Sequence, residues 1–241
     1  MKLNIRILFT LFKKDLRDVL KNANGLFMLL LPLFFSVLYS VMDFGGEFLG
    51  SGYVLMLCCL MCMCMVPVSF LSMIIAEEKE KNTLRTLMLS NVSAAEFILS
   101  KALVTYVMME LVMVASFFIV KYAVSALPSF ILITTLSSFC VIFLGALIGI
   151  VSKNQMSTGI FSTPIMLVLL IPPIFGQMNN FFAGIAKFTP TNAMMQLFFS
   201  LDAGLPLSSS DNLFQIAVIA VWTVLAAAVF VMVYRKKRLD N

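Results

Sequence analysis

The sequence predicts an all-α polytopic membrane protein. Of its 241 residues, 61% are hydrophobic and only 12% are charged, and the mean hydropathy is +1.02. Soluble domains contain about 25% charged residues, so a soluble chain of this length could not bury so much apolar surface. The apolar runs are continuous rather than alternating, which disfavours a membrane β-barrel.

Residues 1–24 have the pattern of a basic amphipathic helix. Its apolar residues recur at helical spacing and form one stripe, made of Ile5, Leu8, Phe9, Phe12, Leu16, Val19 and Leu20. Basic residues flank this stripe: Arg6, Lys13, Lys14, Arg17 and Lys21. We expect a cytoplasmic helix lying in the headgroup plane, while the alternative is a positive cluster that only sets orientation.

Residues 25–241 are expected to form a single transmembrane domain of six spans. The spans cover about residues 26–42, 53–75, 102–120, 128–151, 158–175 and 214–234. Pro67 is expected to kink the second span, because proline removes an internal hydrogen bond. Gly145 and Gly149 of the fourth span form a small-xxx-small pattern that favours close helix contact.

The segment between the fifth and sixth spans is neither a clear span nor a clear loop. It holds two short apolar pieces, residues 181–188 and 193–201, separated by Thr189 and Pro190. We expect short re-entrant extracellular helices that dip into the bilayer. Such backbone is tolerated at membrane depth only where protein or a water-filled cavity satisfies its polar groups.

Basic residues predict the orientation. Of the 17 lysines and arginines, only Lys121 and Lys187 lie on the side of the membrane opposite to the termini. The positive-inside rule therefore places both termini in the cytoplasm, in a bacterial cytoplasmic membrane. The net charge of +5 reflects this orientation and not binding of nucleic acid.

Motifs of common enzymes are missing from the sequence. It has no histidine, no G-x-x-x-x-G-K-[ST] phosphate loop, no H-E-x-x-H and no G-x-S-x-G. We therefore expect no catalytic residue, bound cofactor or ATP hydrolysis in this chain. The cysteines all lie in apolar runs: Cys58, Cys59, Cys62, Cys64 and Cys140. With no Asp or Glu among them, we interpret them as packing residues and expect no metal site.

One substantial charged interruption, Ala76–Lys101, separates the second and third spans. Within it, Leu84, Leu87 and Met88 fall on one face of a helix. We interpret this segment as a cytoplasmic helix that fits a groove on a soluble partner, the alternative being a solvated loop with a fortuitous pattern. The candidate site residues are Glu77, Glu78, Lys79, Glu80, Lys81, Thr83, Leu84, Arg85, Leu87, Met88 and Ser90.

This interruption resembles a loop of the ABC-2 type transporter permeases, whose pattern is roughly E-[KR]-E-x-G-T-L-E-x-L-x-x-S-P-V-S-x-x-E-x-x-x-x-K. The matching residues are Glu78, Lys79, Glu80, Thr83, Leu84, Leu87, Ser90, Val92, Ser93, Glu96 and Lys101. Asn82, Arg85 and Asn91 replace the usual glycine, acid and proline. Residues 188–198 are similar to the family's P-x-x-[YWA] helix, and the final span with Trp222 also fits.

The resemblance implies the membrane subunit of an exporter, with a coupling helix between the second and third spans. It implies pairing with a second copy or a sister permease, driven by a separate ATP-binding cassette ATPase that binds ATP and Mg²⁺. The small size, without a large extracellular domain, resembles permeases for peptide or antibiotic export and lantibiotic immunity. Two alternatives stay open: a secondary transporter, and a membrane sensor or assembly subunit that transports nothing.

Glu110 is an acid inside the third span, on the half that we expect nearer the cytoplasm. An ionisable residue at membrane depth costs free energy and usually faces protein or water. In a functional interpretation it binds a cationic substrate, or a proton or cation in a secondary transporter. In a structural interpretation it makes hydrogen bonds with the loop or with neighbouring helices near the headgroups.

Overall fold

The computed structural model describes residues 4–41, 51–83, 89, 92–176, 178–206 and 208–237. Every regular element in these ranges is helical, and six helices are long and apolar enough to cross a membrane. The predicted all-α class and the number of spans are therefore confirmed. The elements are α1 (Ile5–Lys21), α2 (Ala23–Val41), α3 (Ser51–Met65), η1 (Val66–Leu71), α4 (Ser72–Glu80), α6 (Ala94–Ile119), η2 (Val124–Ala126), α7 (Leu127–Val151), α8 (Gln155–Phe175), α9 (Asn180–Ala186), α10 (Pro190–Asp202) and α11 (Ser210–Lys237).

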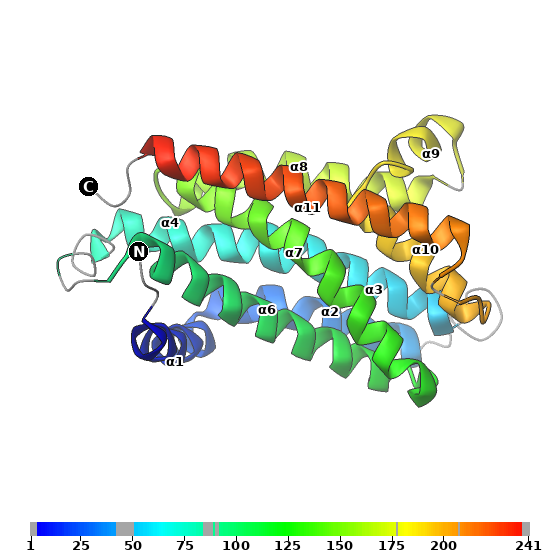
Figure 1. Cartoon of the computed structure of the whole chain (residues 1–241). Coiled ribbons are helices and arrows are strands. Elements are labelled where there is room, and N and C mark those ends of the chain that lie inside the picture. Colours follow the sequence, from blue (N-terminus) through cyan, green and yellow to red (C-terminus); the bar gives the residue numbers. More distant parts are fainter. Residues whose placement is uncertain are drawn as a thin grey trace.

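The spans run side by side, whereas α1 is turned across them and is seen nearly end-on in Figure 1. Helix α1, the end of α4 and the end of α11 lie at one end of the bundle, and α9 and α10 lie at the other (Figure 1). This arrangement agrees with the predicted topology, in which the charged interruption and the two terminal segments share one side.

Helices α3, η1 and α4 form one continuous span that is the core of the bundle. Most of its side chains are buried, whereas those of α11 are mostly exposed. Cys58, Cys59, Cys62 and Cys64 are buried and unpaired here. No group of three or more potential metal ligands occurs among the described residues. The interpretation of these cysteines as packing residues agrees with their burial.

A π-helical segment interrupts the core span at Pro67. Proline has no backbone N–H to donate, and the wider π turn (η1, Val66–Leu71) accommodates this loss inside a continuous helix. Two glycines of α7 pack directly against this region. A Cβ atom on Gly145 would lie 1.9 Å from the carbonyl oxygen of Pro67, and one on Gly149 would lie 2.7 Å from Cβ of Ile75. The close helix contact predicted from the small-residue pattern is confirmed.

Several span boundaries differ from the predicted ones, because polar residues extend the helices beyond the apolar runs. Helix α6 begins at Ala94 rather than near residue 102. Ser93 caps it by accepting a hydrogen bond from the backbone N–H of Glu96, whose carboxylate accepts one from the backbone N–H of Ser93. The core span continues to Glu80 and the last span begins at Ser210.

We expect Gly145→Ala to destabilise the protein, because the new methyl group collides with the Pro67 carbonyl. Overpacking of this kind costs about 1–3 kcal/mol. Thermal unfolding of the purified protein in detergent would show a lower melting temperature. Gly159→Ala in α8 is the matched control, since no atom lies within 4 Å of its added Cβ. Equal melting temperatures of the two variants would contradict the role of Gly145 in close packing.

Candidate coupling site

The last turn of α4 carries four consecutive charged residues, Glu77, Glu78, Lys79 and Glu80. Successive residues of an α-helix are rotated by about 100°, so four in a row point in all directions around the axis. Glu77 pairs with Lys81 on its own segment. The other three contact other helices, so this turn is a junction between α4 and its neighbours.

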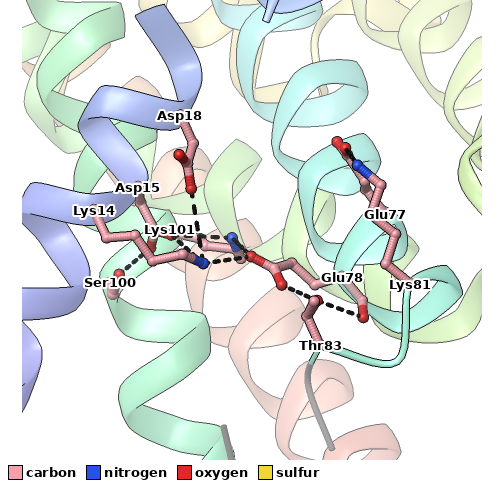
Figure 2. Close-up of polar contacts among 9 residues, drawn as sticks. All are labelled: Lys14, Asp15, Asp18, Glu77, Glu78, Lys81, Thr83, Ser100 and Lys101. Atoms are coloured by element: carbon pink, nitrogen blue, oxygen red, sulfur yellow. Dashed lines mark hydrogen bonds and ion pairs between the residues drawn. The ribbon is translucent and has the colours of Figure 1, made fainter. Parts of the chain in front are cut away.

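Glu78 belongs to a charge network with α1 and α6, drawn in Figure 2. The ammonium of Lys101 on α6 lies 3.2 Å from Oδ1 of Asp15 on α1 and 3.2 Å from Oε1 of Glu78. The side chains of Lys101 and Asp15 are both only 5% exposed. The Ser100 hydroxyl donates to the second oxygen of Asp15. The buried charges are thus paired and hydrogen-bonded, as such burial requires.

Lys14 on α1 forms the outer part of the same network. Its ammonium lies 3.0 Å from Glu78, 3.7 Å from Asp18 and 4.0 Å from Asp15 (Figure 2). Partial burial alone lowers the pKa of Lys14, but the hydrogen bond to Glu78 and the nearby negative charges raise it above its ordinary value on balance. Lys14 therefore stays charged, with three carboxylates in reach.

Lys79 and Glu80 hold the turn between α7 and α8. The Lys79 ammonium donates to the carbonyl oxygens of Gly149 (3.3 Å), Ile150 (2.7 Å) and Ser152 at the end of α7. Carbonyls at a helix C-terminus lack intrahelical partners and favour a cation. The Glu80 carboxylate accepts from the backbone N–H of Gln155, 3.0 Å away, in the first turn of α8. Both contacts use backbone atoms, so they tie α4 to the helices themselves.

The chain turns sharply after α4. Asn82 adopts a positive φ of 55°, a conformation that asparagine tolerates better than most residues. Because asparagine tolerates this conformation, Asn82 can occupy the position at which the family pattern has glycine. Thr83 then donates to the Glu78 carbonyl oxygen (3.0 Å) and to its carboxylate, which orients Glu78. The rest of the predicted site lies outside the described residues: Leu84, Arg85, Leu87, Met88 and Ser90.

A cavity of about 620 Å³ opens beside the network, between α1, α4, α6 and the start of α8. Its lining carries charges of both signs, including Lys14, Asp18, Lys21, Glu77 and Lys81. The outer part of the network therefore faces solvent, while the pair of Lys101 and Asp15 is buried.

Asp15, Ser100 and Lys101 are site residues that the candidate set does not contain. Helix α1 buries the face formed by Leu11, Asp15 and Val19, spaced four residues apart, and it exposes part of the predicted apolar stripe, such as Phe9. The available sequence signal was the position of Asp15, four residues after the apolar Leu11 and four residues before the apolar Val19. It was missed because a lone charge among apolar residues is easily assigned to the solvent face.

The start of α1 is also tied to α6, through the capping residue Glu96. The backbone N–H of Asn4 donates to Glu96 Oε1, 2.7 Å away. Contacts at Glu96 and at Asp15 together hold α1 along the first turns of α6.

Glu110 does not belong to this site. It lies past the midpoint of α6 (Ala94–Ile119), although it lies in the first half of the predicted span 102–120, because α6 begins before the apolar run does. Thr134 and Thr135 of α7 each donate to its Oε1 at 2.9 Å. Glu110 thus makes a contact with a neighbouring helix, one of the partners that the structural interpretation allows.

Comparison with known families decides the class of protein. A family model described as ABC-2 family transporter protein matches residues 39–234. The chain belongs to the ABC-2 transporter family. No curated protein matched it. Its membership of the ABC-2 family makes the chain a multi-pass membrane subunit, a permease of an ABC-type transporter. The family also implies a partner ATP-binding subunit.

The residues matched by the ABC-2 family model include only part of the charge network. Glu78 and Lys101 lie inside the matched residues, whereas Asp15 and Lys14 on α1 precede them. The permease therefore joins its family core to α1 through ion pairs.

We expect Lys101→Met to destabilise the permease strongly, because it removes the nearest cation from the buried Asp15, whose remaining contact with the ammonium of Lys14 is 4.0 Å long. Breaking a buried ion pair costs about 3–5 kcal/mol. Thermal unfolding in detergent would measure the effect. Lys81→Met is the control, since the ammonium of Lys81 is well exposed and pairs only with Glu77 among the described acids. An unchanged melting temperature for Lys101→Met would refute the structural role of the buried pair.

Proposed function

We propose that this permease is the membrane subunit of an exporter that moves a hydrophobic or amphipathic substrate, such as a peptide or antibiotic, out of a bacterial cell. A separate ATP-binding cassette ATPase binds ATP and Mg²⁺ and docks on the segment after α4. The permease works as a pair, with a second copy or a sister permease. Residues 1–24 lie at the cytoplasmic membrane surface, and residues 25–241 form the transmembrane domain.

The observation that carries this proposal is the junction at the end of α4. A force applied to the segment after Thr83 reaches α7 and α8 through Lys79 and Glu80, and reaches α1 and α6 through Glu78. A docking loop can drive a membrane domain only if it is mechanically joined to several spans. The α4 junction meets this requirement within a single helical turn.

The two sets of contacts suit different movements. Lys79 and Glu80 hold backbone atoms of α7 and α8, and the glycine contact of α7 with η1 and α4 adds steric fit. We infer that α4, α7 and α8 move together. Lys14 instead has three carboxylates within 4.0 Å, and two of them, Asp15 and Asp18, lie on α1 itself. Its outer contact with Glu78 can therefore open while the Lys101 pair keeps α1 in place.

The position of α1 fits a helix at the membrane surface. It is turned across the spans at the end that carries the α4 junction (Figure 1), and it exposes Ile5, Phe9 and Leu20. Apolar side chains of a basic amphipathic helix bind favourably in the headgroup region. We propose that this end faces the cytoplasm, where an ATPase would reach it.

Secondary transport through Glu110 is the second candidate. In its favour, Glu110 Oε2 is buried and has no hydrogen-bond partner in the described part of the chain. Its other oxygen is held by two threonine hydroxyls of α7, which suits a carboxyl that joins two helices. ATP-dependent flux in vesicles containing permease and ATPase, absent when the permease is alone, separates the exporter from this candidate and from a sensor.

The double variant Leu84→Asp, Leu87→Asp is expected to abolish binding of the ATPase, because charges replace the predicted apolar face. Co-purification of a tagged permease with its ATP-binding cassette subunit from native membranes would measure it. Leu205→Asp is the matched control: Leu205 is exposed and lies beyond α10, at the opposite end of the bundle. Retention of the ATPase by the double variant would refute the proposal that the ATPase docks on this segment.

Lys79→Met is expected to leave ATPase binding intact and to reduce transport at least about tenfold. It removes hydrogen bonds to the α7 carbonyls, and a hydrogen bond to a charged group contributes about 1.5–3 kcal/mol. Flux and ATP hydrolysis would be measured in the same vesicles. Lys153→Met, in the turn after α7, is the control. Wild-type flux in Lys79→Met would contradict transmission through this contact.

A further inference from the structure

A second cavity, of about 280 Å³, lies at the end of the bundle opposite α1. It is enclosed by α8, α9, α10 and α11, which meet at that end in Figure 1. Three carboxamide side chains line it, from Asn192 and Gln196 on α10 and Gln215 on α11. Lys187, which follows α9, adds an ammonium group. The remaining lining residues are apolar: Pro173, Gly176, Ala183, Ala186 and Met195.

The three carboxamides are available for a ligand. Within the residues that the structure describes, none of these side chains makes a hydrogen bond, although Asn192 is only 8% exposed and Gln215 Oε1 is fully buried. Roughly nine in ten buried polar groups in proteins have a hydrogen-bond partner. Gln215 Oε1, which is buried without a partner, is therefore the atom that packing alone does not explain, while the amide groups of Asn192 and Gln196 are not fully buried and stay open to a ligand.

The charge of the lining residues determines which class of ligand the cavity favours. Among the described residues, Lys187 is the one charged group that lines it, and none of the described carboxylates does. The Lys187 ammonium lies 5.9 Å from the centre of the Phe214 ring, which places it beside α11. The cavity thus favours an anionic group. The carboxamides offer N–H donors to the same anion and oxygen acceptors to a donor beside it.

We propose that this cavity binds a carboxylate flanked by an amide N–H, the combination found at the C-terminus of a peptide. Lys187 and the carboxamide N–H groups donate to the carboxylate, and a carboxamide oxygen accepts from the ligand's N–H. The volume is below the roughly 300–1,000 Å³ of pockets for whole drug-sized ligands, so it suits an end group. This inference rests on the proposed export of peptides, and it assigns an outer site to the C-terminal end.

The chain carries its own reporter for this site. Trp222 is the single tryptophan, and its indole N–H donates to the carbonyl oxygen of Phe188, 2.6 Å away. Phe188 directly follows Lys187 in the chain. A ligand that draws on Lys187 is therefore expected to alter the fluorescence of Trp222.

The test uses the full chain in detergent, without ATPase, and three small probes. N-acetylglycine has the carboxylate and the amide N–H, acetate has only the carboxylate, and N-acetylglycinamide lacks the charge. We expect a saturable change in Trp222 emission, with N-acetylglycine binding more tightly than either other probe. Because no ATPase is present, failure here leaves the proposed ATP-driven export to be judged by its own assays.

Two variants decide the assignment. Lys187→Gln is expected to weaken N-acetylglycine binding at least about tenfold, as loss of a charge-assisted hydrogen bond should. Gln196→Leu is expected to remove the preference for N-acetylglycine over acetate. Lys121→Gln is the matched control, because Lys121 does not line the cavity. Lys187 is exposed, so its replacement should not disturb folding.

Three outcomes would overturn the proposal. The first is the absence of any saturable response, and the second is equal binding by wild type and Lys187→Gln. The third is a response only to nanodiscs containing phosphatidylglycerol and not to N-acetylglycine, which would make the cavity a lipid site.

Discussion

The buried ammonium of Lys101 is the interaction on which the α1 end of the permease depends. A charge removed from water costs several kcal/mol unless ionic partners and hydrogen bonds replace the lost solvation. Asp15 and Glu78 supply the two carboxylates, each 3.2 Å away, and they come from two other helices. The charge is satisfied only when α1, α4 and α6 are all in place. The pair therefore specifies where α1 sits on the membrane domain.

Helix α4 combines this ionic contact with a steric one. On the side of α7, two glycines allow close contact with the Pro67 carbonyl and the Ile75 side chain, and Lys79 donates to the carbonyls at the end of that helix. Such close packing admits little sliding, because any displacement produces a collision. On the side of α1, Lys14 has a choice of partners and lines an open cavity. The same helix is thus closely packed against one part of the bundle and joined to another by charged side chains.

The far end of the bundle is held by different chemistry. Tyr122, between α6 and α7, donates to Asp202 at the end of α10, 2.8 Å away. Burial and the nearby carboxylate raise the pKa of Tyr122 to about 12, so its hydroxyl remains a donor. The stacked rings of Phe130 on α7 and Phe198 on α10 add a further contact with α10. These contacts position α10, which carries two of the three carboxamides of the polar cavity.

The sequence alone determined the features that composition and periodicity encode. Continuous apolar runs predicted the six spans, and the pattern of Gly145 and Gly149 predicted a tight helix contact. The motif around Glu78 predicted the ABC-2 family. Helix starts were misjudged where polar caps such as Ser93 extend a span past its apolar run. Only the tertiary structure decided that Asp15 is buried, because its partner Lys101 is 86 residues away in the chain. It also decided that Lys79 caps α7, since which helix end lies beside a charged residue depends on packing and not on local sequence.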